Sequence, residues 1–290
     1  MKIGVAAFLT EKSGEPGKIA HTAEDLGFES FWVAEHLAVP TTYTTYYPRS
    51  ADGKVPELFA HLVDPFVALS AAAQATKSIW LGTAICLLPE REILSVAKAT
   101  ATLDVYSNGR LIFGVGAGWF REEAEILGVQ FDKRWQHLRE GVEALRAIWS
   151  NDEASYEGEI IKFPPLKLFP KPVQKPYPRI FLGAHDPKYA PRRVARYADG
   201  WFPANLTPQQ ARDTLPEIRR LAKEYGRDPE KLEFGVLLMT QDDGPTLEVM
   251  KQYQEAGVSR LIITARAAAS GNGVEVVKSL APIVERAQQV

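Results

Sequence analysis

The sequence predicts an α/β protein in which strands and helices alternate to form a (β/α)8, or TIM, barrel. Eight apolar runs with the length of strands alternate with helical patterns along the 290 residues. Most of these runs are apolar throughout, which is typical of parallel strands covered on both faces. Eight βα units close most simply into a barrel with its functional residues at the carboxyl ends of the strands. An open doubly wound sheet is the alternative.

The elements follow one another in a regular order. The longest helix begins near Asp132 and carries an apolar stripe at spacings of three and four. Thr207 and Gln210 form a capping-box pattern around Pro208, and Gly226 ends the same helix. The eight expected strands span residues 3–7, 30–34, 79–85, 111–115, 180–182, 200–202, 234–238 and 260–264.

We expect one domain over residues 1–290 with two inserted segments, since a single core can extend to ~250–300 residues. The first insertion, about 37–62, follows the second strand and contains a threonine- and tyrosine-rich run. The second, about 155–177, has the pattern of a hairpin followed by a proline-rich strap. Both are too long for ordinary βα connections, so we expect them to be ordered additions to the barrel.

Charge and composition limit the class of partner. The 34 basic and 36 acidic residues nearly balance, and no run of five or six like charges occurs, so neither nucleic acid nor an anionic membrane is an expected partner. The first ten residues do not resemble a secretion signal, and no apolar run approaches the length of a membrane span. The single cysteine excludes an internal disulfide. We therefore expect a cytoplasmic protein that acts on a small molecule.

The most informative stretch is 103–119, where an apolar strand ends in Gly114, Gly116 and Gly118. Glycine at every second position lets the backbone lie against a planar or anionic ligand. The spacing differs from the dinucleotide fingerprint, and such glycines also occur as bulges or packing points. We interpret the segment, with Ala117, as one wall of a cofactor site.

Glu35 and His36 end the second strand. A carboxylate beside a group that titrates near neutrality can serve as a general acid and base, or can bind a ring. The alternative is a histidine that only holds the long loop after it.

Small residues end the third strand at Thr83 and Ala84, followed by Ile85. This is another place where a ligand can pack against bare backbone. Cys86 has no base nearby in the sequence, so we expect a buried apolar residue and not a nucleophile.

Two further strand ends are candidates for anion binding. Gly183, Ala184 and His185 precede an Asp-Pro helix start, where free amides favour phosphate, although an ordinary capped connection explains the pattern equally well. Arg266, after the last strand, is suited to a carboxylate or phosphate, or is simply solvated.

Several chemistries lack support in the sequence. The five histidines form no His-x-His or His-x-x-x-His pair, so we expect no metal site. No serine occupies a nucleophile elbow, and no lysine lies in an expected strand where it could form a Schiff base.

Several motifs together resemble the luciferase-like monooxygenase superfamily, and within it the oxidoreductases that use the deazaflavin coenzyme F420. They include Trp-Val-Ala-Glu-His at 32–36 and Gly-Val-Gly-Ala-Gly-Trp at 114–119. The others lie at 81–84, 97–104, 107–110 and 198–201. The resemblance runs in consistent order from residue 2 to about 202.

The resemblance implies a barrel that holds a flavin or deazaflavin at the carboxyl ends of its strands. It places His36 at the reacting centre, a non-prolyl cis peptide within Thr83–Ala84–Ile85, and Gly116 and Gly118 along the cofactor. It also places the cofactor phosphate at Gly183–Ala184–His185. Sugar-phosphate dehydrogenases of the family have a glutamate at the position of Trp119, so that substrate is not implied. Relatives are commonly homodimers.

From these observations we predict an oxidoreductase that transfers a hydride between reduced F420 and an unsaturated or carbonyl-bearing small molecule. His36 would donate or orient a proton, and Glu35 would set its orientation or charge. The expected substrate pocket comprises Tyr43, Tyr46, Trp119 and Arg266. The alternatives are an FMN-dependent monooxygenase that uses dioxygen, a non-catalytic cofactor-binding protein, and a cofactor-free isomerase or hydrolase.

Overall fold

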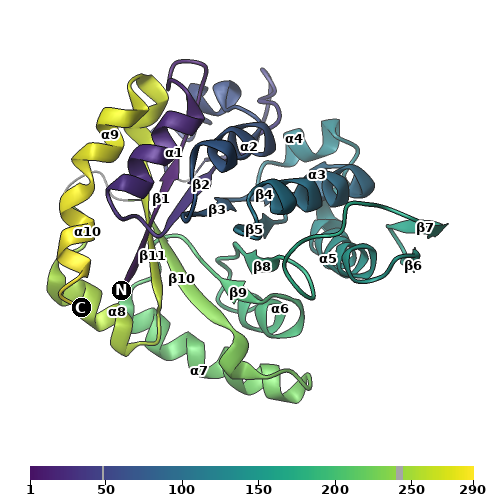
Figure 1. The fold of residues 1–290 in the computed structure, drawn as a ribbon. Coiled ribbons are helices and arrows are strands. Elements are labelled where there is room, and N and C mark those ends of the chain that lie inside the picture. Colours follow the sequence, from purple (N-terminus) through teal and green to yellow (C-terminus); the bar gives the residue numbers. More distant parts are fainter. Residues whose placement is uncertain (48, 240–243) are drawn as a thin grey trace.

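A closed parallel barrel forms the centre of the computed structural model, which describes residues 1–47, 49–239 and 244–290 (Figure 1). Within these residues nine parallel strands lie in the order β3-β2-β1-β11-β10-β9-β8-β5-β4, and β3 also pairs with β5, which closes the barrel. The strands are β1 (Lys2–Ala7), β2 (Ser30–Val33), β3 (Trp80–Thr83), β4 (Cys86–Leu87), β5 (Leu111–Gly116), β8 (Arg179–Leu182), β9 (Gly200–Trp201), β10 (Glu233–Leu238) and β11 (Arg260–Ala265). The predicted fold class is confirmed.

One strand differs from its prediction. The strand predicted at 79–85 ends at Thr83 in the structure, because the chain leaves the ladder at Ala84–Ile85 and re-joins it in β4, where Cys86 pairs with Val115. β3 and β4 together take one position in the barrel, so the nine strands fill the eight strand positions of a (β/α)8 barrel.

Helices surround the barrel (Figure 1). Thr207 and Gln210 form the predicted capping box on α7, and Asp64 caps α2 through the N–H groups of Phe66 and Val67. The helices are α1 (Pro16–Asp25), α2 (Pro65–Ala75), α3 (Ile93–Tyr106), α4 (Arg121–Ile126), α5 (Arg134–Ser150), α6 (Ala190–Tyr197), α7 (Pro208–Glu224), α8 (Leu247–Glu255), α9 (Gly273–Ser279) and α10 (Ala281–Ala287). No described helix has both the length and the apolar character needed to cross a membrane.

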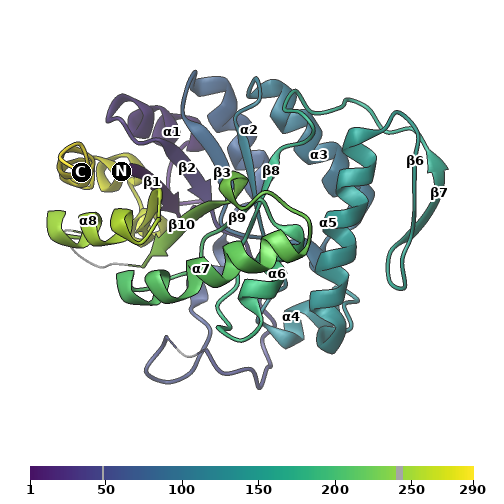
Figure 2. The same cartoon turned by 90° about the horizontal axis from the view of Figure 1, so that it is seen from below.

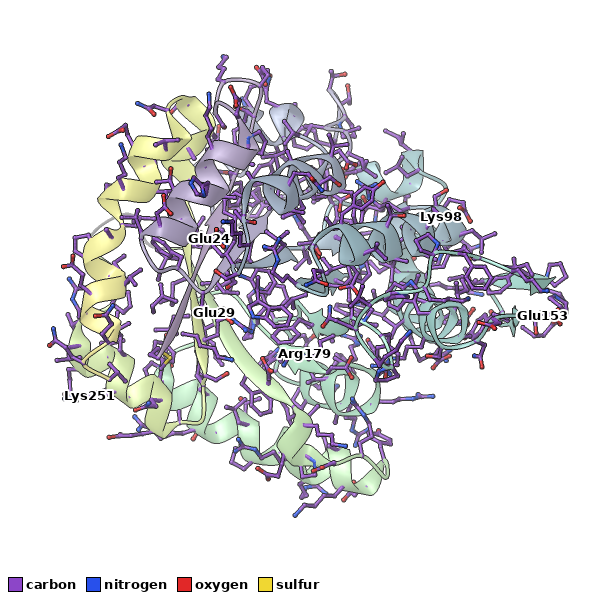
Figure 3. All side chains as sticks on the ribbon, in the orientation of Figure 1. Glu24, Glu29, Lys98, Glu153, Arg179 and Lys251 are labelled. Carbon is purple, nitrogen blue, oxygen red and sulfur yellow. The ribbon has the colours of Figure 1, made fainter. Side chains whose placement is uncertain are left out.

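The barrel interior is filled from its amino end. Arg260 is 1% exposed and pairs with Glu29 and Glu233, and the latter also pairs with Arg179. Glu29 and Arg179 are labelled in Figure 3, where they lie inside the ring of helices. Trp32, Phe181 and Phe202 form an aromatic layer above these charges, with ring centroids 5.3–6.4 Å apart. This packing closes the amino end, so a ligand has room only at the carboxyl end.

Two long connections leave the barrel. Residues 34–47 and 49–64, which include the 3-10 turn η1 (Glu57–His61), extend from its carboxyl end beside α4 (Figure 2). The strands β6 (Ala154–Glu157) and β7 (Lys162–Leu166) form an antiparallel hairpin that projects away from the barrel (Figures 1 and 2). We call residues 34–47 and 49–64 the mouth loop, because their aromatic side chains pack at the carboxyl end of the barrel.

Candidate active site

Small residues line the carboxyl end of the barrel. Side chains alternate along a strand, so inward-facing positions recur every second residue beyond the aromatic layer. The inward positions next to this layer are Ala6, Ala34, Ala84, Gly114, Gly116 and Gly183. Thr264 of β11 also faces inward here, and its buried hydroxyl has no hydrogen-bond partner within the described chain. The mouth is therefore a cradle of small residues with one unpaired hydroxyl.

The connection between β3 and β4 forms one side of this cradle. The Ala84–Ile85 peptide is cis, at the position that the resemblance implied. Thr83 Oγ1 donates a hydrogen bond of 2.6 Å to the carbonyl oxygen of Gly114, which ties the connection to β5.

Ile85 explains two of the glycines. Its side chain lies against Gly116 and Gly183, and a Cβ atom on Gly116 would overlap Ile85 Cδ1. A Cβ atom on Gly183 would lie 2.9 Å from Ile85 Cγ2. The glycines of β5 and β8 are therefore required by the close approach of the β3–β4 connection.

His36 lies at the mouth with its imidazole held on three sides. Its Nδ1 atom is 2.5 Å from Glu123 Oε2, and its ring stacks on Phe59 at a centroid distance of 4.6 Å. Trp119 meets the ring edge-on at 5.7 Å. Within the described chain Nε2 has no hydrogen-bond partner. A carboxylate at Nδ1 selects the orientation in which Nε2 is the nitrogen available to a ligand.

Glu123 of α4 also fixes the loop. Its side chain is fully buried, and its Oε1 atom accepts hydrogen bonds from the N–H groups of Leu37 and Ala38 at 2.7 and 3.1 Å. Its neighbour Glu122 accepts from the hydroxyl and N–H groups of Thr44 and Thr45. Two adjacent carboxylates thus bind two parts of the mouth loop, and one of them also binds the imidazole.

The prediction that Glu35 orients His36 is wrong. Glu35 is 5% exposed and faces Arg91, whose Nε donates to it at 2.5 Å, and it accepts from the N–H of Leu87 at 3.2 Å. Arg91 also pairs with Asp64 at 2.7 Å. Burial raises the pKa of Glu35 while Arg91 opposes the shift. Glu35 therefore links the end of β2 to β4. The carboxylate that orients His36 is Glu123 instead.

Glu90, at the end of the 3-10 turn η2 (Leu88–Glu90), is a third carboxyl group in this region. It is 6% exposed, and neither carboxyl oxygen has a hydrogen-bond partner in the described chain. Burial, followed by the charges of Glu123 and Glu35, raises its pKa from 4.5 to about 9. Enclosure without a partner therefore favours the neutral form of Glu90.

The predicted pocket residues divide into two groups. Trp119 stacks on Phe120 at 5.2 Å and contacts Tyr47 at 5.2 Å, and Tyr43 meets Phe120 edge-on at 5.3 Å. Tyr46, by contrast, is 64% exposed. Trp119 and Tyr43 thus join the aromatic cluster at the mouth, and Tyr46 lies outside it.

Arg266 is separated from the aromatic cluster around His36 by the ring of Phe8. Its guanidinium is 5.9 Å from the ring of Phe8, and Phe8 stacks on Phe59 at 6.1 Å. Arg266 also lines a separate cavity of about 390 Å³ with Thr10 and His61.

The predicted phosphate turn is occupied by internal hydrogen bonds. The carbonyl oxygen of Ala184 accepts from Trp201 Nε1 at 2.9 Å, and His185 Nε2 accepts from the N–H of Ala204 at 3.3 Å. The helix that follows begins at Ala190, four residues after Asp186, so its N-terminus does not adjoin the turn as expected. The N–H of Gly183 donates to the carbonyl oxygen of Val115 at 2.9 Å, so the N–H of Ala184 remains a candidate for an anion.

Glu123, Glu90 and Phe59 were not identified from the sequence, whereas Tyr47 ends the threonine- and tyrosine-rich run that was expected to shape the pocket. Glu122 and Glu123 have the pattern of ordinary acidic residues in a first helical turn. Tyr47 and Phe59 lie within the loop that was expected to shape the pocket, and their hydrophobicity was the available signal.

Comparison with known proteins identifies relatives along most of the chain. A family model described as luciferase-like monooxygenase matches residues 6–284. An uncharacterised protein of Mycobacterium tuberculosis is 34% identical over 267 residues, which cover 90% of this chain and 91% of that protein. The phthiodiolone/phenolphthiodiolone dimycocerosates ketoreductase of the same species is 32% identical over 211 residues, 70% of this chain and 55% of the ketoreductase.

Solved structures agree on the fold. The monooxygenase RslO1 from Streptomyces bottropensis superposes with a TM-score of 0.74 at 21% identity, and the match covers 97% of this chain and 98% of RslO1. The coenzyme F420-dependent tetrahydromethanopterin reductase from Methanopyrus kandleri gives a TM-score of 0.71 at 18% identity, with coverages of 97% and 98%. With the family match over residues 6–284, these findings show that the chain belongs to the luciferase-like monooxygenase family.

Proposed function

We propose that the protein is an F420-dependent oxidoreductase that transfers a hydride between the reduced deazaflavin and a carbonyl-bearing or unsaturated small molecule. The observation that carries the proposal is the His36–Glu123 pair at a barrel mouth lined by alanine and glycine. A hydride transfer to a carbonyl group needs a flat hydride donor and a proton source beside it. The cradle of small residues leaves room for the flat hydride donor. The imidazole of His36 would be the proton source.

The residues at the mouth fit a planar ring. The small side chains of Ala34 and Ala84 leave room for a ring to approach, and the unpaired Thr264 hydroxyl offers a hydrogen bond to a polar ring edge. The segments that would hold the ring are 83–85 and 116–118, and the amides of Ala184 and His185 would face its phosphate. When bound, the deazaflavin supplies a hydride and lacks the ring nitrogen that makes a flavin reactive with oxygen.

The aromatic cluster would exclude water and shape the substrate pocket. Tyr47, Phe59 and Trp119 pack around His36, whose side chain is 8% exposed. A dry pocket strengthens the interaction between His36 and a developing alkoxide, because the local dielectric constant is low.

The comparisons support the proposal in two ways. The M. kandleri reductase uses F420 on the same fold, and the mycobacterial ketoreductase is named for the reduction of a ketone. The second candidate function is FMN-dependent oxygenation, which the likeness to a Streptomyces monooxygenase favours. Both candidate functions would use the same site at the carboxyl end of the barrel. They differ in whether that site binds F420 or FMN.

A fluorescence titration of the purified apo-protein with oxidised F420 and, separately, with FMN tests the proposal. We expect micromolar or tighter binding of F420 and weaker binding of FMN. Reduced F420 is then offered with small ketones and α,β-unsaturated carbonyl compounds. Preferential binding of FMN would favour an FMN-dependent monooxygenase instead. Tight F420 binding without turnover of any acceptor would favour a non-catalytic cofactor-binding protein.

We also propose that the protein is a homodimer, as is common among relatives. Sedimentation equilibrium at micromolar concentration tests this, and a mass near 32.2 kDa, that of one chain, would contradict it.

A further inference from the structure

Two arginine side chains beside the cradle have no carboxylate bound to them. Arg134 is the first residue of α5 and Arg193 lies on α6, and both are half-buried. Neither forms an ion pair within the described chain, where Arg134 donates only to carbonyl oxygens and Arg193 contacts only rings. A guanidinium that is partly removed from water without gaining an anion costs free energy, so the pair requires an explanation.

Both arginines lie next to segments that would hold the cofactor. Nε of Arg134 donates to the carbonyl oxygen of Gly118 at 3.2 Å, and Gly118 ends the segment that follows β5. Arg193 lies on the helix that follows the turn at 183–185, where the phosphate would bind. β5 and β8 are adjacent in the barrel, so the connections that leave them lie side by side. The two cations therefore stand where a side chain of the cofactor would leave the cradle.

Aromatic rings hold the two guanidinium groups in place. The guanidinium carbon of Arg193 lies 3.7 Å from the centroid of Trp135, the residue after Arg134, and that of Arg134 lies 3.9 Å from the centroid of Phe131. Stacking on a ring fixes the plane of a guanidinium and leaves its N–H edges open to an acceptor in that plane. Nη2 of Arg134 and all the guanidinium nitrogens of Arg193 are without a hydrogen-bond acceptor in the described part of the chain.

The neighbouring acids are engaged elsewhere. Asp132 and Glu125 pair with Arg121 of α4 at 2.8 and 3.0 Å. Asp186, before α6, accepts from the N–H of Lys188 at 2.9 Å. Each of these carboxylates thus has its own donor, and the positive charge beside the cradle stays uncompensated.

The electrostatics agree with this geometry. Burial lowers the pKa of Arg134, and the charges of Arg121 and Arg193 lower it further. Burial also lowers the pKa of Arg193. Cations that repel one another and are partly shielded from water form a field that attracts an anion.

We propose that Arg134 and Arg193 bind carboxylate groups of the cofactor side chain beyond its phosphate. This inference rests on the proposed function. The side chain of F420 continues past the phosphate into a chain of lactate and glutamate units that carries several carboxylates, whereas that of FMN ends at the phosphate. A planar guanidinium fork matches a carboxylate in two parallel hydrogen bonds. The protein would therefore select F420 over FMN by the side chain as well as by the ring.

A fluorescence titration isolates the contribution of the carboxylates. The two ligands are F420 and the 5′-phosphate of the same deazaflavin, which has the same ring and phosphate but no carboxylate chain. We expect the wild-type protein to bind F420 roughly 10- to 100-fold more tightly than the 5′-phosphate. The difference should be smaller at about 500 mM salt than at about 50 mM, because salt screens exposed charges.

Arg193→Gln tests the site, because the Arg193 side chain donates no hydrogen bond within the described chain and its removal should not disturb the fold. We expect a Kd for F420 raised roughly 5- to 30-fold and a Kd for the 5′-phosphate within about 2-fold of wild type. Arg196→Gln, at an exposed position of the same helix, is the matched control and should change neither value. Arg134→Gln should resemble Arg193→Gln, with urea unfolding to show that it is folded.

The outcomes separate this inference from the proposed function. Equal affinity of the wild-type protein for the two ligands, or an unchanged Kd for F420 in Arg193→Gln, overturns the carboxylate site and leaves the proposed function in place. An equal loss in Arg196→Gln would show a diffuse effect of charge and would also overturn it. An unchanged Kd for F420 with a raised KM for a carboxylate-bearing ketone would assign the arginines to the substrate instead. A wild-type protein that binds neither deazaflavin overturns the proposed function and this inference together.

Discussion

Glu123 Oε2 lies 2.5 Å from Nδ1 of His36, although 87 positions separate the two residues in the chain. The same carboxylate accepts from the N–H groups of Leu37 and Ala38. The orientation of the imidazole and the position of the mouth loop are therefore set by one buried group. This relationship organises the site and leads to the first two predictions.

Replacing His36 with alanine should leave the dissociation constant of F420 within a few-fold and lower turnover by ~10²–10⁴, because it removes the proton donor but not the cradle. Steady-state kinetics and the fluorescence titration measure the two quantities. His21→Ala, at an exposed position of α1, is the control. Unchanged turnover in His36→Ala would remove His36 from the mechanism.

Glu123→Gln should lower turnover by roughly 10- to 100-fold, because an amide does not hold the imidazole as a carboxylate does. It should also reduce the free energy of unfolding by about 1–3 kcal/mol through weaker hydrogen bonds in a buried position. Urea unfolding and kcat are compared with those of Glu125→Gln. Equal kcat values in the two variants would contradict the orienting role of Glu123.

Gly116→Ala should reduce the free energy of unfolding by about 1–3 kcal/mol, because the new Cβ atom overlaps Ile85 Cδ1. Adding Ile85→Ala should recover part of this loss, since it removes the obstacle. A double-mutant cycle in urea measures the coupling free energy between the two positions. Simple additivity would show that Ile85 is not the reason for glycine at position 116.

Glu90→Gln should change the pH dependence of stability. The pKa of Glu90 in the folded protein, about 9, lies above its ordinary value of 4.5, so the folded state binds the proton more tightly than the unfolded state. The wild-type protein therefore loses stability relative to Glu90→Gln as the pH rises from 4.5 to 9, by at most about 1.4 kcal/mol per pH unit. Urea unfolding of both proteins at pH 5, 7 and 9 measures this difference. A constant difference would indicate that Glu90 is ionised throughout.

Glu122 should hold the outer part of the mouth loop through its charge. Partial burial opposes ionisation, but the hydroxyl and N–H groups of Thr45 and Thr44 outweigh it and lower the pKa of Glu122 to about 2. The stabilisation is complete above pH 4.5 and is lost as the pH falls towards 2. Hydrogen exchange should show lower protection factors at Thr44 and Thr45 in Glu122→Gln at pH 7. Equal protection in variant and wild type would mean that the loop is held by its aromatic contacts alone.

Much of the barrel could be predicted from the sequence, because each strand is a local apolar run and each helix carries its own stripe and caps. The segment at 79–85 could not be read in the same way. Its composition is that of one continuous strand, and the division into β3 and β4 arises from how Ile85 packs against Gly116 and Gly183.

The candidate site shows the same limit. The sequence by itself determined the apolar strands, the alanine and glycine positions at their ends and a histidine after the second strand, since these depend on neighbours within a few residues. Only the tertiary structure decided that Arg91 pairs with Glu35, that Glu123 binds the imidazole of His36 and that Glu90 is left without a partner in the described chain. The physical reason is that a carboxylate pairs with whichever donor folding brings within about 3 Å, and the competing groups lie on separate βα units.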